Sequence, residues 1–317
     1  MTDTQNEVFK SPVNKIRLFE HGAPGSQNLK LTRKYYTEDM PDGRVKHIVQ
    51  NITDPDIVRY IPDGIGNSTD RQRIPAVLII PGGAFRRLVY NFEGEDVAKW
   101  LNSMGIAAFV LECRLPSDEH DNAEDVPLID AMRAMRVIRG RAQEFGIDEA
   151  KIGVMGFSAG GFMAALLSTA YESDVYADYK YKDEYDKLSA RPDFAVCSYP
   201  VISIDDCIEA GKRYMSEEQV LERISDSKAK ILHKYNPDKL VRPDMPPVFI
   251  CETDDDRTTL SENSVGFYMA ARKAGVSAEL HIFRTGGHGY GCGDDFSQTG
   301  EWKVLFTKWI KSIGIIS

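Results

Sequence analysis

Short apolar runs alternate with longer amphipathic segments over most of the chain between positions 76 and 283. The runs lack the in-out alternation of a half-exposed strand, which is typical of strands that are covered on both faces. Amphipathic segments between such strands are typical of crossover helices, so the pattern predicts the α/β class, with a mostly parallel sheet between helices. The predicted strands are 76–80, 106–111, 152–155, 194–197, 248–251 and 280–283.

Three segments have the spacing of amphipathic helices. Between the second and third predicted strands, apolar side chains recur every three or four residues, with arginines on the other faces. The apolar positions are Leu128, Ala131, Met135 and Ile138. A second helix is predicted from Ser261 to Ala274, where Gly275 ends it. A last helix carries Trp302, Leu305, Phe306 and Trp309.

Other segments break this alternation. We expect an irregular lead-in over residues 1–30 and antiparallel edge strands within 45–60. Segments 171–191 and 204–242 follow strand ends, where open α/β sheets bind their ligands, so we predict that they form a rim or cap over a site. The alternative is that both are solvated excursions without substrate contact. The whole chain, 1–317, is then predicted to be a single domain.

Composition excludes several classes of protein. Of 317 residues, 42% are hydrophobic and 27% are charged, which is ordinary for a globular protein and unlike a disordered or fibrous one. The formal net charge is −9, and no dense run of Lys or Arg is present. Nucleic acid and membrane are therefore not expected as partners.

The cysteines and the N-terminal residues indicate a compartment. Five scattered cysteines have neither the density of a disulfide framework nor the paired spacing of a zinc site, which favours a reducing environment. The first residues are polar and acidic, and no apolar run approaches the length of a membrane span. We therefore expect a soluble, cytoplasmic protein.

A candidate nucleophile lies between a predicted strand and a helix. Gly156, Ser158 and Gly160 form a G-x-S-x-G motif in the strand-turn-helix setting in which that motif exposes a serine on a sharp turn. The following helix directs its first amides, including that of Ala159, at the space over Ser158 where an oxyanion would form. The alternative is a glycine-rich helix start that only packs closely on the sheet.

A loop of small residues follows the first predicted parallel strand. In Pro81-Gly-Gly-Ala-Phe85, backbone N–H groups can approach a substrate oxygen without obstruction by side chains. The tripeptide Pro81-Gly-Gly83 alone would indicate only a turn. Its position before the nucleophile motif indicates an oxyanion loop. We assign the oxyanion donors to the amides of Gly83, Ala84 and Ala159.

The candidate base and acid come later in the chain. Among six histidines, only His288 lies in a glycine-flanked loop after a late strand. Asp254, Asp255 and Asp256 follow the strand that ends near Cys251, which gives the order Ser, Asp, His. The residues alone leave all three aspartates open, and at least one is expected to cap the following helix. Because no His or Glu accompanies them at ligand spacing, we predict no metal and no cofactor.

Several segments, in the same order along the chain, resemble the carbohydrate esterase branch of the α/β-hydrolases, which includes acetyl-xylan and feruloyl esterase-like proteins. This branch is related to the hormone-sensitive-lipase-like and prolyl-oligopeptidase-like enzymes. The segments are 21–25, 51–55, 81–85, 133–161, 191–194, 199–202, 246–249, 262–264 and 286–289. The resemblance implies the α/β-hydrolase fold and a Ser-Asp-His triad, with Asp255 as its acid and Asp256 as the second choice. The chain departs from the family at Ala84 (usually Gly), at Glu252 (often His) and at 257–260.

The resemblance implies a serine esterase that hydrolyses small O-acyl esters, especially acetyl groups on carbohydrate, through an acyl-enzyme. Its substrate would be a small-molecule or oligosaccharide ester. An amide hydrolase of the exopeptidase or formamidase type, and a non-catalytic binding protein on the same fold, are the alternatives. The acyl group, the alcohol and the oligomeric state stay open.

Overall fold

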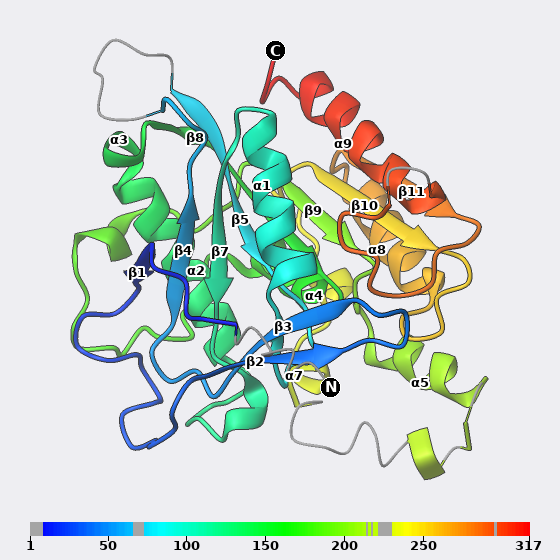
Figure 1. Cartoon of the computed structure of the whole chain (residues 1–317), viewed down its shortest axis with the longest axis horizontal. Helices are drawn as coiled ribbons and strands as arrows, with labels where there is room; N and C mark the ends of the chain where they lie inside the picture. The colour runs from blue at the N-terminus through cyan, green and yellow to red at the C-terminus, as the bar shows by residue number, and fades with distance from the viewer. Residues whose placement is uncertain (1–8, 66–72, 214, 217, 221–229, 295–296) are drawn as a thin grey trace, which may run out of the picture.

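An eight-stranded sheet crosses the molecule in the order β1-β4-β7-β5-β8-β9-β10-β11 (Figure 1). The structure is a computed structural model that describes residues 9–65, 73–213, 215–216, 218–220, 230–294 and 297–317. The strands of this sheet are β1 Lys15–Arg17, β4 Asp56–Tyr60, β5 Ile74–Ile80, β7 Ala107–Glu112, β8 Ile147–Phe157, β9 Ala195–Ser198, β10 Val248–Thr253 and β11 Ala278–Phe283.

The six strands predicted from apolar runs are all present and pair in parallel with one another, while β7 also pairs antiparallel with β4. They form one continuous block from β7 to β11, so their carboxyl ends lie along a single edge of the sheet. Five of them are buried, as predicted. The sixth, β11, is half-exposed because it is the last strand of the sheet and has a neighbour on one side only.

Helices cover both faces of the sheet. On one face, α1 and α9 contact each other through Trp100 and Trp302, whose ring centroids lie 4.9 Å apart. On the other face, α2 packs on α4, and α8 lies beside β10 and β11 (Figure 1). The helices are α1 Asp96–Ser103, α2 Val126–Gly140, α3 Ala142–Phe145, α4 Ala159–Ala170, α5 Ile204–Lys212, α7 Lys230–Lys234, α8 Ser261–Lys273 and α9 Glu301–Ser312. The three helices predicted from periodicity correspond to α2, α8 and α9.

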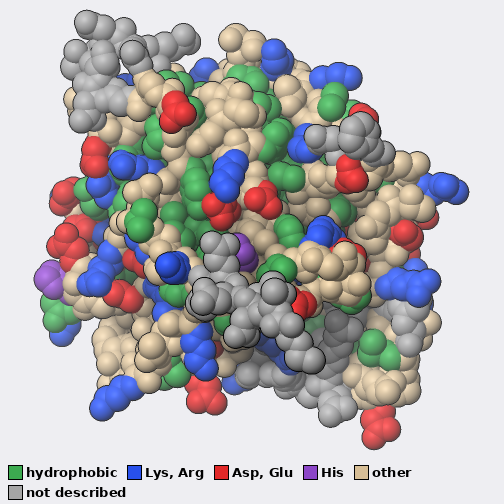
Figure 2. Space-filling view, viewed as in Figure 1, with side chains coloured by type: hydrophobic (Ala, Val, Ile, Leu, Met, Phe, Trp, Pro, Cys, Tyr) green, Lys and Arg blue, Asp and Glu red, His purple; other side chains and the backbone are tan. Residues whose placement is uncertain are grey.

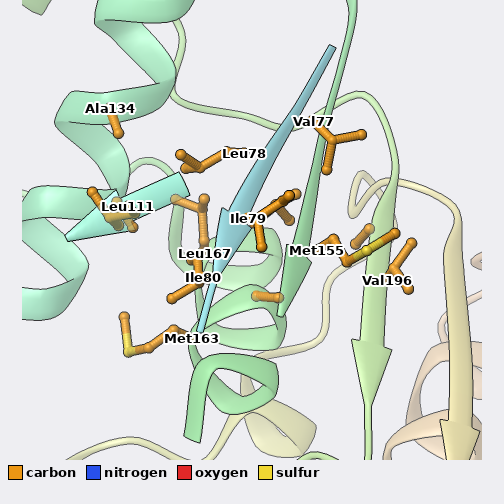
Figure 3. Close-up of a cluster of buried hydrophobic side chains, with 14 of the residues drawn as sticks. Val77, Leu78, Ile79, Ile80, Leu111, Ala134, Met155, Met163, Leu167 and Val196 are labelled. Atoms are coloured by element: carbon orange, nitrogen blue, oxygen red, sulfur yellow. The ribbon is translucent and has the colours of Figure 1, made fainter. Parts of the chain in front are cut away.

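Apolar side chains fill the layer between the sheet and the helices. Val77, Leu78, Ile79 and Ile80 of β5 lie at the centre, between side chains of the neighbouring strands and of α2 and α4 (Figure 3). Residues of β5 alternate in direction along the strand, so a strand that contacts helices on both faces must be apolar throughout. This is why its sequence shows an unbroken run.

The structure corrects the expectations for the first 60 residues. Within the expected irregular lead-in, β1 pairs antiparallel with β4, because the strand at the sheet edge still offers backbone groups for pairing. The expected edge strands of 45–60 divide between two sheets. β4 lies inside the main sheet between β1 and β7, whereas β3 (Val45–Gln50) pairs with β2 (Lys34–Asp39) and β6 (Leu88–Val89) in a small antiparallel sheet.

The two predicted rim segments have different positions. Residues 171–191 contact α2, where Arg133 pairs with Asp183 and Arg136 donates to the backbone of Leu188. Other contacts lie elsewhere, since Tyr171 donates to Asp244 and Tyr179 to the carbonyl of Gly22. The contacts with α2 hold 171–191 beside this helix, and its role as a rim over the site stays a prediction. In segment 204–242, α5 follows β9, while residues 214, 217 and 221–229 lie outside the described residues.

Charged side chains of both signs are interspersed on the face shown in Figure 2. None of the helices in the described ranges is long and apolar enough to cross a bilayer. Four of the five cysteines, Cys113, Cys197, Cys251 and Cys292, are free thiols, and all but Cys292 are buried.

Candidate active site

Ser158 lies on the sharp turn between β8 and α4. Its backbone has φ 55° and ψ −118°, a region that residues with a side chain rarely adopt. The turn closes because Gly156 and Gly160 have no Cβ: a Cβ on Gly156 would collide with the carbonyl oxygen of Gly160, and one on Gly160 with that of Ile80. The motif therefore has the strand-turn-helix setting that the sequence predicted.

Ser158 and His288 are hydrogen-bonded. Oγ of Ser158 lies 2.9 Å from Nε2 of His288, although the two residues are 130 positions apart in the chain. His288 follows β11 in a loop and leaves about a fifth of its side chain exposed, whereas Ser158 is 8% exposed. A serine hydroxyl beside an imidazole nitrogen is the arrangement that allows the imidazole to remove the hydroxyl proton.

The carboxylate next to His288 belongs to Asp256. Oδ2 of Asp256 lies 2.6 Å from Nδ1 of His288, and the aspartate side chain is fully buried. Burial raises the pKa of this carboxyl, but the hydrogen bond and the charge of His288, together with the amides of Thr258 and Thr259, outweigh it and hold the pKa below its usual value. The ionised carboxylate can thus orient the imidazole.

The expected contact between Asp255 and His288 is not formed, which corrects the choice made from the family resemblance. The chain turns directly after β10, where the amide of Asp256 donates to the carbonyl of Thr253, and this turn directs Asp256 rather than Asp255 to the imidazole. Asp255 instead accepts hydrogen bonds from the amides of Gly286 and Gly287, at 2.9 and 2.8 Å. It therefore holds the loop that carries His288.

The expectation that one of these aspartates caps α8 is wrong: the N-cap residue is Leu260, and no side chain among the described residues caps the helix by a hydrogen bond, because the aspartates contact groups other than its free amides. Asp254 accepts a hydrogen bond from the hydroxyl of Ser261, the first residue of α8, at 3.4 Å. Asp256 accepts from the amides of Thr258 and Thr259 just before the same helix, at 2.6 and 3.0 Å. Asp256 thus combines a turn-stabilising role with its contact to His288.

The loop after β5 presents backbone amides near Ser158. Gly83 and Ala84 adopt positive φ values of 138° and 57°. Within the described residues, neither amide donates to a protein acceptor. Ala159 is the first residue of α4, so its N–H has no carbonyl one turn earlier in the helix. The three predicted donors are therefore available for a ligand oxygen.

Two residues near this site were not assigned to it from the sequence, although Tyr199 begins one of the segments that resemble the family. Glu93 lies in η1 (Asn91–Glu95), a one-turn π-helix, and its buried carboxylate accepts hydrogen bonds from the amide of Gly82 and the hydroxyl of Tyr199. The ring of Tyr199 meets that of His288 edge-on, at a centroid distance of 5.0 Å. Glu93 belongs to no motif that the sequence showed, and the segment 199–202 gave no role for Tyr199; only the folded chain brings both residues close to Ser158.

The geometry supports acyl transfer through a serine. It joins a nucleophile, a base and an ionised acid in one hydrogen-bonded series, with free amides beside the nucleophile. In the described part of the chain, no three His, Cys, Asp or Glu side chains are grouped as they would be to hold a metal ion.

A family model and two curated proteins match most of the chain. A family model described as BD-FAE matches residues 65–270. An acetylxylan esterase of Xylanibacter ruminicola is 31% identical over 240 residues, which cover 75% of this chain and 45% of that protein. An endo-1,4-beta-xylanase B of Butyrivibrio fibrisolvens is 29% identical over 269 residues, which cover 82% of this chain and 40% of that protein. The chain thus spans less than half the length of these curated relatives.

Solved structures show a similar fold. An acetyl ester-xyloside bifunctional hydrolase from Caldicellulosiruptor lactoaceticus has a TM-score of 0.70 and 35% identity, covering 96% of this chain and 98% of that chain. A thermophilic esterase from Thermogutta terrifontis has a TM-score of 0.64 at 23% identity, covering 93% of this chain and 96% of that chain. The predicted α/β-hydrolase fold is thereby confirmed.

Proposed function

Since the chain belongs to the BD-FAE family, we propose that it is a serine esterase that hydrolyses small O-acyl esters, above all acetyl groups on carbohydrate. The observation that carries this proposal is the hydrogen-bonded series from Ser158 through His288 to Asp256, with distances of 2.9 and 2.6 Å. The likeness to an acetylxylan esterase and to an acetyl ester-xyloside hydrolase supports an acetylated sugar as substrate.

In the acylation step, Nε2 of His288 accepts the proton of Ser158 while Oγ attacks the ester carbonyl carbon. The carbonyl oxygen becomes an oxyanion, which the amides of Gly83, Ala84 and Ala159 stabilise by hydrogen bonds. Asp256 stabilises the imidazolium that has formed. His288 then donates its proton to the leaving alcohol oxygen as the C–O bond breaks, which leaves the acyl group on Ser158.

Deacylation repeats the same steps with water. His288 removes a proton from a water molecule, the hydroxide attacks the acyl carbonyl carbon, and a second oxyanion forms beside the same amides. His288 returns the proton to Oγ of Ser158 as the acyl bond breaks. The products are a carboxylic acid, the deacylated sugar and the original enzyme, so the cycle needs no cofactor.

The substrate class can be tested with matched chromogenic compounds. We expect p-nitrophenyl acetate to be cleaved faster than the butyrate and feruloyl esters, acetylated xylo-oligosaccharides to release acetate, and aminoacyl-p-nitroanilides to react far more slowly. Faster cleavage of the anilides would instead indicate an amide hydrolase.

The nucleophile can be tested with Ser158→Ala. This variant keeps the oxyanion donors but cannot form an acyl-enzyme, so we expect kcat to fall by about 10⁴-fold or more while the circular dichroism spectrum is unchanged. If the variant kept even about a tenth of the wild-type kcat, Ser158 would not be the nucleophile.

We also propose that the protein acts in the cytoplasm on sugar esters that have entered the cell. The free and mostly buried thiols support a reducing compartment.

A further inference from the structure

Glu93 is a buried carboxyl group next to the proposed triad that the mechanism above does not use. Its side chain comes from the short helix η1 that follows the oxyanion loop, and the residue is 5% exposed. Oε2 accepts a hydrogen bond from the amide of Gly82 at 2.8 Å, and Oε1 accepts one from the hydroxyl of Tyr199 at 2.9 Å. One carboxyl group thus contacts both the oxyanion loop and the segment that follows β9.

A second set of contacts continues from Tyr199 to the loop of His288. The phenolic oxygen of Tyr199 accepts a hydrogen bond from the amide of Gly291 at 3.0 Å. Its ring lies edge-on against His288 and against Tyr290, with centroid distances of 5.0 and 4.5 Å. Through Tyr199, Glu93 therefore connects the loop of the proposed oxyanion donors with the loop of the proposed base.

The space behind the nucleophile leaves little room for movement. A Cβ on Gly82 would lie 2.8 Å from Oε2 of Glu93 and 2.9 Å from Cβ of Ser158, so only glycine fits between them. The carboxyl group of Glu93 is thus packed against the backbone that separates it from Ser158. A displacement of Glu93 would shift the residue directly before Gly83 and Ala84.

The hydrogen bonds require Glu93 to accept at both oxygens. Gly82 and Gly291 supply N–H groups, which only donate. Because the amide of Gly291 points at the oxygen of Tyr199, the single phenolic hydrogen is free to point at Glu93. Two donors on two carboxyl oxygens match the ionised form, in which both oxygens accept.

Burial and the surrounding groups shift the pKa of the Glu93 carboxyl in opposite directions. Burial raises the pKa of Glu93 above its usual value, and His288, the hydrogen bonds from Tyr199 and Gly82, and Lys46 of β3 offset this rise only in part. Burial and the charge of Glu93 raise the pKa of Tyr199 well above its usual value, so this phenol stays a donor.

The other titratable groups around these residues come from β10 and the loop after it, from the loop of His288, and from the residues after Glu93. On β10, Cys251 is close enough to act on Tyr199 and Tyr290, and Glu252 on Tyr290. Asp256, from the loop after β10, contacts the Nδ1 side of His288. Tyr290 follows His288 in the same loop and keeps its proton, because burial raises its pKa well above the usual value. Glu95 and Asp96 follow Glu93 in the chain, and Glu95 pairs with Lys99.

We propose that Glu93 is a positioning residue of this site, whose carboxylate fixes the oxyanion loop relative to the loop of His288 and favours the imidazolium formed during attack. The proposal rests on the esterase function proposed above. Two carboxylates then act on His288: Asp256 by direct contact, and Glu93 through the field across a buried site, where charges interact more strongly than in water.

The test compares Glu93→Gln with the wild type and with Glu95→Gln, which makes the same chemical change two residues later at a partly exposed position. The dependence of kcat/KM on pH is measured with p-nitrophenyl acetate. A carboxylate near His288 favours its protonated form, and the protonated form is inactive as a base. Glu93→Gln should therefore move the acid limb of the profile to lower pH, by about half a pH unit or more. Glu95→Gln should leave the limb in place.

A third variant separates charge from position. Glu93→Ala removes the acceptors of Gly82 and Tyr199, so we expect a tenfold to hundredfold lower kcat, roughly the effect of a misplaced catalytic group. Glu93→Gln keeps an acceptor oxygen and should lose less than about tenfold. An unmoved acid limb in Glu93→Gln would overturn the proposal, whether or not kcat falls, because Glu93 would then be a packing residue only. Wild-type activity that depends on Ser158 would still support the esterase function in that case.

Discussion

Asp256 is held in place by contacts on both of its carboxyl oxygens. Oδ1 accepts from the amides of Thr258 and Thr259, while Oδ2 accepts from the hydroxyl of Thr259 at 3.0 Å and contacts His288. A carboxylate with this many donors has little freedom to rotate, so the lone pair that meets Nδ1 is fixed in direction. The neighbouring Asp255 has no comparable contact with the imidazole.

We predict that Asp256→Asn lowers kcat by about 10³ to 10⁴, because an amide nitrogen facing Nδ1 would favour the wrong tautomer of His288. Asp255→Asn keeps an oxygen for the amides of Gly286 and Gly287, so it should cost less than about tenfold. Asp254→Asn should have a similarly small effect. Measurement of kcat for the three variants, with circular dichroism as a check of folding, distinguishes them. A large loss at Asp255 with near-normal activity at Asp256 would contradict the assignment.

At this scale, the sequence was informative where a residue had a distinctive setting. The glycines around Ser158 and the glycine-flanked loop of His288 indicated both residues, and the structure brings them into contact. Three adjacent aspartates differ only in the direction that the turn gives to each side chain. That direction depends on backbone hydrogen bonds between β10 and its surroundings, which no local pattern in the sequence reports.

Among the elements, α8 supports the segment that connects β9 to α5. Asn263, in the first turn of α8, is fully buried, and its Oδ1 accepts from the amides of Ile202 and Ser203 at 2.9 and 3.0 Å. The same segment begins with Tyr199, which contacts Glu93 and His288. One asparagine on a helix thus fixes the backbone that leads away from the site.

We predict that Asn263→Ala destabilises the protein by about 2–4 kcal/mol, because it leaves two buried amides without an acceptor. The melting temperature should fall by several degrees, at roughly 1.5 °C per kcal/mol for a chain of this size. Met269→Ala, on the exposed side of the same helix, is the control and should change it by less than about 1 °C. Equal melting temperatures for the two variants would show that water replaces the lost acceptor.

The elements also show how far periodicity predicts a fold. The parallel strands and α2, α8 and α9 were predicted because each buries an apolar run or stripe that the sequence displays directly. β1 and β6 have three and two residues, too few for any period to be visible. The position of 171–191 depends on ion pairs such as Arg133 with Asp183, formed by residues 50 positions apart.

At the scale of the whole molecule, one buried carboxyl makes stability depend on pH. Glu252, at the end of β10, is fully buried and accepts from the amide of Thr253 and the hydroxyl of Ser264. Burial, and next the nearby charge of Asp256, raise its pKa well above the usual value. The folded protein therefore holds this proton more tightly than the unfolded chain does.

Because the pKa of Glu252 is higher in the folded state than in the unfolded chain, the stability of the protein falls as pH rises. A carboxyl with a raised pKa in the folded state contributes stability that is fully present below the unfolded pKa and is lost as pH rises through the folded pKa. Glu252→Gln has no proton to lose. We predict that its melting temperature exceeds that of the wild type by a margin that grows between pH 5 and pH 9, reaching about 2 °C or more. The exposed Glu20→Gln should show no such trend. A constant margin across this range would mean that Glu252 does not titrate there.

The backbone conformation of Ser158 lowers the thermal stability of the protein in favour of the proposed reaction. Its φ of 55° with ψ of −118° is a conformation that glycine adopts freely and that any other residue adopts at a penalty of about 1–3 kcal/mol. Selection for thermal endurance alone would therefore favour glycine at position 158 and discard the hydroxyl. On the proposed function, the serine persists in this conformation because selection for the hydrolytic reaction outweighs selection for stability.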